Sequence, residues 1–337
     1  MRAFVITAPG EGSVQDVAPP APVAGEVVVD VARVGVCGTD VEIFTGEMAY
    51  LRDGHAAYPM RIGHEWCGTV SALGDGVDRA WLGVRVVGDT MLGCGECLRC
   101  RSGRGHVCEQ REEVGIRRGR PGALAEQLAV PAASLHRLPE DVDDASGAMV
   151  EPGGNALRAV RAAGLSAGAR TLVLGPGTIG LLVAQFARAA GVEVHTVGIT
   201  EASLTFAQEL GIEGVWTAQT LPPLPFDAVI DASYAPALPA LALDLVQPGG
   251  RVVYIGLAGS ASRIDTRELV LKDVTAVGIL SGSHGLAGAI ESYAAGTVDP
   301  RPLVAATVGL EQIGDVLAGR RPDGAGAAPK IQVDPQR

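Results

Sequence analysis

The sequence has few aromatic residues and no long block of charge of one sign. Only 4% of its 337 residues are aromatic, whereas 47% are hydrophobic, so we expect an aliphatic core. Charged residues make up 19% of the chain and are dispersed, which argues against a disordered or nucleic-acid-binding protein. The formal net charge of −11 also disfavours DNA and anionic membranes as partners, and it is compatible with a cationic substrate.

The sequence also lacks an apolar run of the roughly 20 residues that a membrane helix needs. Its start, Met1 to Ile6, turns polar too soon for a signal peptide. We therefore expect a cytoplasmic protein whose cysteines stay reduced. Its length predicts two domains, and its six cysteines are partly clustered, which favours metal binding over disulfides.

A glycine motif lies at mid-chain between a strand pattern and a helix pattern. Thr171 to Leu174 read as a buried strand, and the apolar pattern after the motif reads as a helix that ends at Gly191. This context distinguishes a dinucleotide site from a glycine-rich turn without a ligand, which is the alternative. The motif is Gly175-Pro176-Gly177-Thr178-Ile179-Gly180.

Each glycine of this motif has a separate physical task in a dinucleotide-binding Rossmann domain. Gly175 permits the tight turn, Gly177 lets the pyrophosphate approach the backbone, and Gly180 lets the helix pack closely on the sheet. The N-terminus of the helix then offers free N–H groups to the phosphates. The motif therefore predicts a Rossmann domain that binds NAD or NADP.

The end of the next predicted strand bears on the choice of cofactor. Glu193 to Gly198 form this strand, and Gly198 stands where NAD-binding folds usually place an acidic residue. Its absence removes repulsion against a 2′-phosphate, yet residues 199–203 contain no cation to pair with one. This favours NAD and leaves NADP open, with Glu201 as an alternative ribose contact.

Later strand patterns indicate where else the cofactor is contacted. The patterns cover 226–233, 251–257 and 275–278, and ligands of open parallel sheets lie beyond the carboxyl ends of the strands. The resulting cofactor-lining candidates are Ala232, Ser233, Gly256, Leu257, Leu280 and Ser281.

Four cysteines follow one another within 15 residues: Cys94, Cys97, Cys100 and Cys108. Four thiolates at such spacing close a tetrahedral zinc shell and leave no open position, so the predicted site is structural. The alternative is four free thiols in a flexible loop, which would be prone to oxidation.

A second set of metal-binding side chains precedes this cluster. Cys37 follows a predicted strand and His64 lies in Gly63-His64-Glu65, so the chain offers a thiolate and an imidazole, both of which zinc accepts. A catalytic site needs a third protein ligand, and the two candidates are Glu65 and Glu151. Cys67 is an alternative further ligand, but we interpret it as a core residue.

These motifs, in this order, resemble the zinc-dependent medium-chain alcohol and polyol dehydrogenases over most of the chain. The resemblance rests on Cys37-Gly38-Thr39-Asp40, Gly63-His64-Glu65, the four cysteines, Val150-Glu151-Pro152 and the glycine motif. It implies an α/β protein with a GroES-like, mostly-β catalytic domain and a Rossmann doubly wound parallel sheet. We expect the catalytic domain at 1–150 and 285–337, the Rossmann domain at 151–284, and a homodimer or homotetramer.

The resemblance also implies a role for each site residue. Glu151-Pro152 is similar to the sorbitol and threonine dehydrogenase branch, where a glutamate is the third zinc ligand; Glu65, bridged by water, is the alternative. Asp40 would orient His64, and Thr39 would take the substrate proton. Glu42 stands where the family often has a histidine. Lys330 would approach the pyrophosphate, with a solvated surface lysine as the alternative.

The expected activity is oxidation of a secondary hydroxyl of a polyol, sugar, aminosugar or aminocyclitol to a ketone, with hydride transfer to NAD(P). A weaker likeness, carried by Gly63 to Trp66 and Arg85 to Thr90, is to dehydrogenases of aminoglycoside antibiotic biosynthesis. The alternatives are a zinc-free enoyl or quinone reductase and a non-catalytic NAD(P)H-binding protein. Cys37 together with His64 argues against both.

Overall fold

The computed structural model describes residues 1–337 and divides the chain into two compact units. The first unit contains Met1–Glu151, Val304–Gly326 and Lys330–Arg337, and the second contains Pro152–Leu303 and Ala327–Pro329. The first boundary lies beside the expected one at residue 150. The second expected boundary, at 285, is wrong, because the second unit continues to Leu303.

The misplaced boundary concerns helix α10 (Leu286–Ala294), which packs on helix α5 (Val150–Ala163). A Cβ added at Gly153 of α5 would lie 2.1 Å from the Tyr293 hydroxyl, and one at Gly154 would lie 3.1 Å from a methyl of Leu286. The two helices therefore approach each other at small residues, and α10 stays with the second unit. Sequence periodicity predicts such a helix but not the surface against which it packs.

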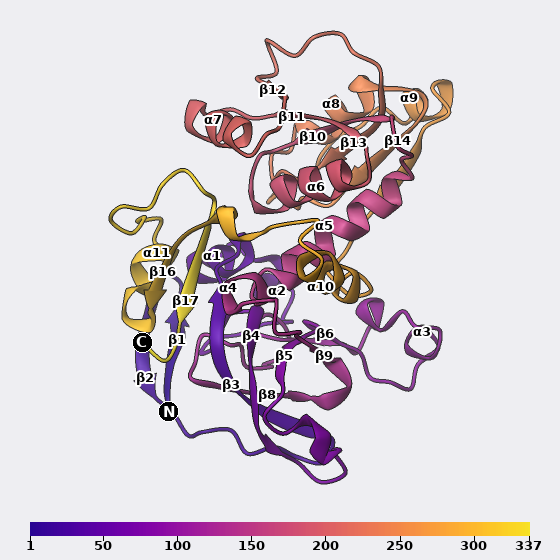
Figure 1. The fold of residues 1–337 in the computed structure, drawn as a ribbon. Coiled ribbons are helices and arrows are strands. Elements are labelled where there is room, and N and C mark those ends of the chain that lie inside the picture. The colour runs from indigo at the N-terminus through magenta and orange to yellow at the C-terminus, as the bar shows by residue number, and fades with distance from the viewer. The chain divides into compact units, whose positions relative to one another are not determined.

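The first unit is built on a seven-stranded sheet with the order β16-β17-β3-β4-β5-β9, in which β8 also pairs with β3. The C-terminal strand β17 (Lys330–Asp334) runs antiparallel to β3 (Glu26–Gly35), so the tail returns to the first unit as predicted. Figure 1 shows the yellow C-terminal strands beside the indigo N-terminal ones. The remaining strands of the unit are β1 (Arg2–Ala8), β2 (Glu11–Asp16), β4 (Glu65–Leu73), β5 (Arg85–Gly88), β6 (Met91–Leu92), β7 (Glu112–Glu113), β8 (Gln127–Pro131), β9 (Leu135–Arg137) and β16 (Val304–Gly309).

Short helices complete the first unit around an aliphatic core. They are α1 (Gly38–Thr45), α2 (Ala49–Arg52), α3 (Leu98–Arg101), α4 (Asp144–Gly147) and α11 (Ile313–Leu317). The core contains many more valines, leucines and isoleucines than aromatic residues, as the composition predicts. Cys67 is fully buried, and its Sγ lies 3.2 Å from the carbonyl oxygen of Asp144. Burial raises the pKa of the Cys67 thiol, so this residue is a core residue as interpreted.

Two elements of the first unit are shorter than the sequence patterns that predict them. Residues 122–130 have the apolar pattern of a strand, but β8 begins only at Gln127, because the segment before it packs on the loop that precedes His64. A Cβ at Gly122 would lie 2.2 Å from the carbonyl oxygen of Ile62. Residues 141–149 have the pattern of a helix start, but helix α4 is limited to Asp144–Gly147 and is followed by α5.

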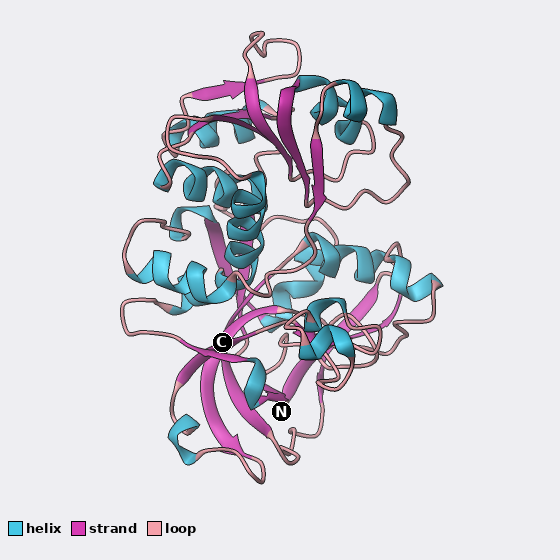
Figure 2. Ribbon diagram, turned by 90° about the vertical axis from the view of Figure 1, so that its right-hand side faces the viewer, coloured by secondary structure: helices cyan, strands magenta, loops and turns pink.

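The second unit contains six parallel strands in the order β12-β11-β10-β13-β14-β15, which is the strand order of a Rossmann domain. Its central strand β10 buries Leu172, Val173 and Leu174 completely, as expected for a sheet covered on both faces. Figure 2 shows helices on either side of these strands. The strands are β10 (Arg170–Leu174), β11 (Glu193–Val197), β12 (Gly214–Trp216), β13 (Phe226–Asp231), β14 (Val246–Tyr254) and β15 (Thr275–Gly278), and the other helices are α6 (Thr178–Ala189), α7 (Glu201–Glu209), α8 (Leu238–Leu245) and α9 (Thr266–Leu271).

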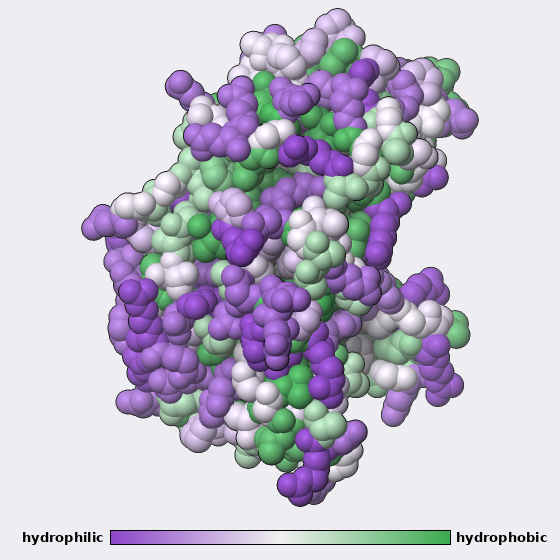
Figure 3. Space-filling model, in the orientation of Figure 1, coloured by the Kyte–Doolittle hydropathy of each residue, from purple (hydrophilic) through white to green (hydrophobic).

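The surface agrees with the dispersed charge in the sequence. Hydrophilic residues cover most of the face seen in Figure 3, with smaller apolar areas between them. No helix of this protein combines the length and the apolar character that crossing a bilayer requires.

Candidate metal centres and dinucleotide site

Strand pairing brings the first predicted metal ligands together. Cys37 is the N-cap of α1 and lies two residues after the end of β3, whereas Glu65 is the first residue of β4 and His64 directly precedes it. Antiparallel pairing places Gly35 of β3 opposite Glu65 of β4. One ligand atom each from Cys37, His64 and Glu65 consequently lies within 4.8 Å of the other two.

Asp40 supports this group from a fully buried position. Its carboxylate accepts hydrogen bonds from the backbone N–H groups of Cys37 (2.9 Å) and Gly63 (3.2 Å). The same carboxylate lies 3.4 Å from Nδ1 of His64, a charge contact whose geometry falls short of a hydrogen bond. Because Asp40 faces Nδ1, the other ring nitrogen of His64 is available to a metal, which matches the orienting role implied for Asp40.

His64 is a buried imidazole beside an acidic side chain. Burial by itself lowers the pKa of His64, but the charge of Asp40 and the nearby Cys37 thiol outweigh it and raise this pKa well above its ordinary value. A raised pKa favours the protonated imidazole, whereas a histidine that binds a metal must be neutral, so protonation and metal binding compete at this side chain.

The donor set of this group fits zinc. A thiol, an imidazole and a carboxylate are the ligand types that zinc accepts, and three protein ligands leave a fourth position open. Glu151, the other candidate for the third ligand, is the second residue of α5 and is half-buried. The group of three closely spaced ligand atoms contains Glu65 and does not contain Glu151.

Lys330 lies in this metal centre, which the sequence did not indicate. Its side chain is 3% exposed, and its Nζ lies 2.6 Å from Glu65 Oε2 and 2.9 Å from the carbonyl oxygen of Val36. The alternative of a solvated surface lysine is therefore wrong. The predicted pyrophosphate contact gains no support either, because the amine already serves Glu65 and Val36. These partners are 265 and 294 residues away in the sequence, and no local pattern reports such pairing.

Thr39 and Glu42, the predicted proton-relay residues, both lie on α1 and are half-buried. Burial, followed by the nearby charge of Glu47, raises the pKa of Glu42. A carboxyl group with a raised pKa gives up and takes a proton closer to neutral pH than an exposed one does. The relay itself stays a prediction.

Asp40→Asn should weaken the metal centre without unfolding the unit. The amide keeps the volume of the carboxylate but removes the charge that faces His64, so we expect about a 10- to 100-fold loss in zinc affinity or activity. Competition with a chelator measures the affinity. Glu11→Gln, on β2 and outside the metal centre, is the control, and equal zinc affinity in wild type and Asp40→Asn would contradict the orienting role.

The four clustered cysteines form a second group with the geometry of a closed zinc site. All four sulfur atoms lie within 4.8 Å of one another, with Cys94–Cys100 at 3.9 Å and Cys97–Cys108 at 3.7 Å. The edge of a tetrahedron with Zn–S bonds of about 2.3 Å is about 3.8 Å. None of the four forms a disulfide. A hydrogen bond from the backbone N–H of Cys100 lowers the pKa of Cys97, which favours the thiolate that zinc binds.

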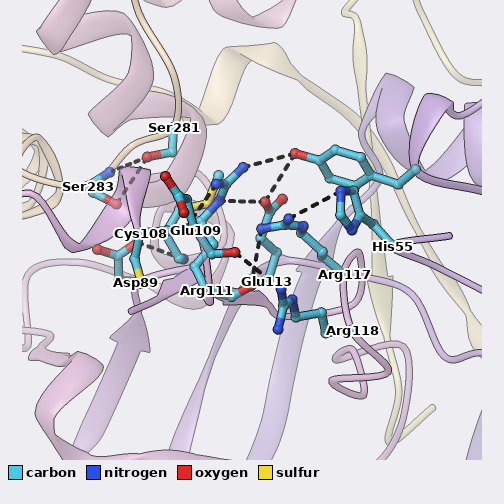
Figure 4. A network of polar contacts seen from close by, with 12 residues as sticks. His55, Asp89, Cys108, Glu109, Arg111, Glu113, Arg117, Arg118, Ser281 and Ser283 are labelled. Carbon is cyan, nitrogen blue, oxygen red and sulfur yellow. Dashed lines mark hydrogen bonds and ion pairs between the residues drawn. The ribbon is translucent and has the colours of Figure 1, made fainter. Parts of the chain in front are cut away.

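A polar network attaches this cysteine loop to the rest of the first unit (Figure 4). Arg111 donates to Glu113 (2.8 Å), to the Tyr50 hydroxyl (3.0 Å) and to the carbonyl oxygen of Cys108 (3.2 Å). Arg117 lies over the Tyr50 ring at 5.4 Å and contacts His55. Glu113 is almost fully buried, so the network holds one wall of the loop rigidly.

The predicted dinucleotide turn has the geometry that its glycines require. Gly175 has φ +97°, which favours glycine, and a Cβ at Gly180 would lie 1.9 Å from the carbonyl oxygen of Gly175. Gly177 has φ −87° and nothing within 4 Å of an added Cβ. It caps α6 without a side-chain hydrogen bond, so the first N–H groups of the helix remain for a phosphate.

Two other predicted cofactor-lining residues, Gly198 and Ser233, lie against this turn. A Cβ added at Gly198 would lie 2.7 Å from the Pro176 ring, and a Cβ added at Gly175 would lie 3.3 Å from the Cβ of Ser233. A Cβ added at Gly256 would lie only 1.6 Å from the carbonyl oxygen of Ser233. Leu257 is 73% exposed beyond β14. Leu280 and Ser281 follow β15, and their carbonyl oxygens accept hydrogen bonds from Arg158.

Sequence reasoning missed one residue at this edge of the sheet, Asp231. It is buried at the end of β13, and its carboxylate accepts hydrogen bonds from the backbone (3.0 Å) and hydroxyl (2.7 Å) of Ser233. Burial raises the pKa of Asp231 despite these bonds. An acidic residue at the end of an apolar strand was the available signal.

The glycine turn permits a matched pair of variants. Gly177→Ala should keep the free energy of unfolding near wild type, because the added methyl meets no atom, but it should obstruct a pyrophosphate and weaken NAD(P) binding. Gly180→Ala should cost about 1–3 kcal/mol of stability, because its methyl collides with backbone. Denaturation and cofactor titration measure the two effects, and wild-type cofactor affinity in Gly177→Ala would contradict the assignment.

Two family models match the chain. Residues 23–140 match the alcohol dehydrogenase GroES-like domain, and residues 178–295 match the zinc-binding dehydrogenase domain. The first match covers the two sets of metal ligands except Glu151, and the second begins within the glycine motif.

Curated relatives cover most of the chain. A 2-dehydro-3-deoxy-L-galactonate 5-dehydrogenase of Pseudoalteromonas atlantica is 34% identical over 312 residues, which is 88% of this chain and 89% of that protein. An L-threonine 3-dehydrogenase of Saccharopolyspora erythraea is 33% identical and covers 83% of each chain.

Solved structures share the fold of this chain and contain a nicotinamide cofactor. A zinc-binding dehydrogenase of Sinorhizobium meliloti bound to NADP is 27% identical, with a TM-score of 0.89 over 99% of each chain. An alcohol dehydrogenase of Escherichia coli CFT073 in complex with NADH is 26% identical, with the same TM-score and coverage. Together with the metal centres and the Rossmann sheet, these matches show an NAD(P)-dependent alcohol dehydrogenase. The chain belongs to the zinc-dependent medium-chain alcohol and polyol dehydrogenase family.

Proposed function

We propose that this protein oxidises a secondary hydroxyl of a polyol, sugar or aminosugar to a ketone, with zinc at the group of Cys37, His64 and a glutamate and with NAD preferred over NADP. The observation that carries the proposal is the convergence of three metal-ligand atoms within 4.8 Å of one another, backed by the buried Asp40. A reductase or a binding protein that works without zinc has no need of this arrangement.

In this proposal, zinc, the nicotinamide cofactor and the side chains of the protein have separate roles in the reaction. When bound, zinc would supply Lewis acidity to the substrate oxygen, and the nicotinamide would be the hydride acceptor. In our proposal Thr39 accepts the hydroxyl proton, and Glu42, whose pKa is raised by burial, receives it toward solvent. The alcohol thus loses one proton and one hydride, and a C=O double bond replaces the C–OH group.

The third zinc ligand is Glu65 or Glu151, and one variant of each decides. Glu65 lies with Cys37 and His64, whereas Glu151 stands in the Glu-Pro pair that resembles the sorbitol and threonine dehydrogenase branch. The glutamine variant of the true ligand should lose zinc faster to a chelator than the other variant does.

For the substrate we propose an aminosugar or aminocyclitol, in a step of aminoglycoside antibiotic biosynthesis. The net charge of −11 supports a cationic substrate. L-threonine, which several relatives oxidise by name, also carries an amine beside a secondary hydroxyl. The galactonate dehydrogenase relative instead favours a sugar acid.

A reduction assay with NAD and with NADP tests this function on three substrate classes: neutral polyols, sugar acids and aminocyclitols or aminosugars. We expect the largest kcat/KM for the amine-bearing class and for NAD. A higher kcat/KM for sugar acids would overturn the aminoglycoside assignment. Absence of turnover in every class, with both zinc sites filled, would favour the non-catalytic alternative.

We further propose that the protein is cytoplasmic. We also propose that it is a homodimer or homotetramer, and a mass measurement in solution tests this oligomeric state.

A further inference from the structure

The Glu65–Lys330 ion pair lies within the proposed zinc centre and is almost completely removed from solvent. The two side chains are 2% and 3% exposed, with 2.6 Å between Glu65 Oε2 and Lys330 Nζ. Such burial is costly for each charge alone, so either side chain without its partner would be strongly destabilised. Lys330 is also one of only two lysines in the chain, the other being Lys272 in the second unit.

The surroundings fix the Glu65 carboxylate on two sides. A Cβ at Gly35 would lie 2.2 Å from Glu65 Oε2, so the β3 backbone leaves no room for a larger residue there. On the other side, Lys330 is tied to the carbonyl oxygen of Val36, which directly precedes Cys37. The carboxylate therefore has the lysine amine at 2.6 Å from one oxygen and the ligand atoms of Cys37 and His64 within 4.8 Å of one of its oxygens.

The charges around this group explain why a lysine is needed. Cys37, Asp40 and Glu65 supply three acidic groups; His64 faces Asp40, and Lys330 contacts Glu65. A metal cation and the lysine amine would therefore attract the same carboxylate. A carboxylate that is paired with a lysine is a weaker metal ligand than an unpaired carboxylate, since its negative charge is already partly compensated.

We propose that Lys330 is a positioning residue that retains one carboxylate oxygen of Glu65, so that Glu65 cannot occupy two positions of the zinc shell and one position stays open for the substrate oxygen. The inference rests on the proposed function, since it takes Cys37 and His64 to be zinc ligands. In this inference a residue of β17, Lys330, controls how Glu65, the first residue of β4, binds the metal.

The sign of one measurement tests this role. In Lys330→Met the buried Glu65 carboxylate has no counter-ion other than the zinc, so we expect it to bind the zinc more tightly. A chelator should then remove the zinc at least about tenfold more slowly than it does from wild type. A merely structural role predicts faster loss, because the site would loosen. The relevant kinetic phase is the one that is missing in Cys37→Ala, which separates it from release by the four-cysteine site.

A second variant protects the test against misfolding. Glu65→Gln/Lys330→Met contains no unpaired buried charge, and it should release zinc at the rate of Glu65→Gln alone, because the lysine acts only through Glu65. Lys330→Arg should stay near wild type, and Lys272→Met is the control for loss of a lysine elsewhere. In the cobalt-substituted protein, the visible spectrum of Lys330→Met should no longer change when a small anion such as azide is added.

The outcomes separate the two proposals. If wild type holds no zinc at the Cys37 group, the proposed function fails and this inference with it. If wild type holds that zinc and Lys330→Met releases it as fast as or faster than wild type, only the role of Lys330 is overturned. An effect of Lys330→Met that persists in the Glu65→Gln background would also overturn it.

Discussion

Cys37→Ala should lower the zinc content from two ions per chain to one and decrease kcat/KM by at least about a thousandfold. The variant removes the thiolate of the proposed catalytic site and leaves an imidazole and a carboxylate, which hold zinc poorly. Loss of Lewis-acid stabilisation worth several kcal/mol corresponds to that factor in rate. Metal analysis of the purified protein and steady-state kinetics measure the two effects.

Cys67→Ala is the matched control for this experiment. It also removes a thiol, but one that is buried in the core and outside both metal groups, so it should keep both zinc ions and lose only stability. If wild type contains a single zinc ion and Cys37→Ala keeps it, only the four-cysteine site is filled. The proposed chemistry would then fail, and the zinc-free reductase would become the better reading.

Cys97→Ala should remove the other zinc ion and open the loop that the four cysteines close. Few hydrophobic residues of this loop are buried: Cys94 and Leu98 are exposed, and Cys108 alone of the four thiols is buried. Metal binding is therefore a large part of what folds the loop. Without it we expect proteolysis within 94–108 to be at least about tenfold faster, since cleavage follows the population of the open form.

The catalytic centre provides the internal control for this variant. The Cys37 group should keep its zinc, because its ligands come from α1 and from the start of β4 and share no residue with the loop. Unchanged proteolysis in Cys97→Ala would mean that the network of Arg111, Glu113 and Tyr50 holds the loop without metal. Fragment masses locate the cleavage sites.

The sequence alone predicts the local motifs of this protein. The glycine turn depends on residues within one βα unit, and the four-cysteine site on residues within one short loop, so spacing alone specifies their geometry. Parallel strands separated by helix patterns likewise predict a Rossmann sheet, and the observed strand order agrees with it. The family resemblance added the order of the motifs and is confirmed by the family models.

The tertiary structure decided whatever depends on contacts between distant segments. Pairing of β3 with β4 places Cys37 beside His64 and Glu65, and pairing of β17 with β3 brings Lys330 to Glu65. The packing of α10 on α5 moved the expected domain boundary from 285 to 303. Hydrophobic periodicity reports which face of an element is buried but not which partner covers it, because burial gains free energy from any apolar surface.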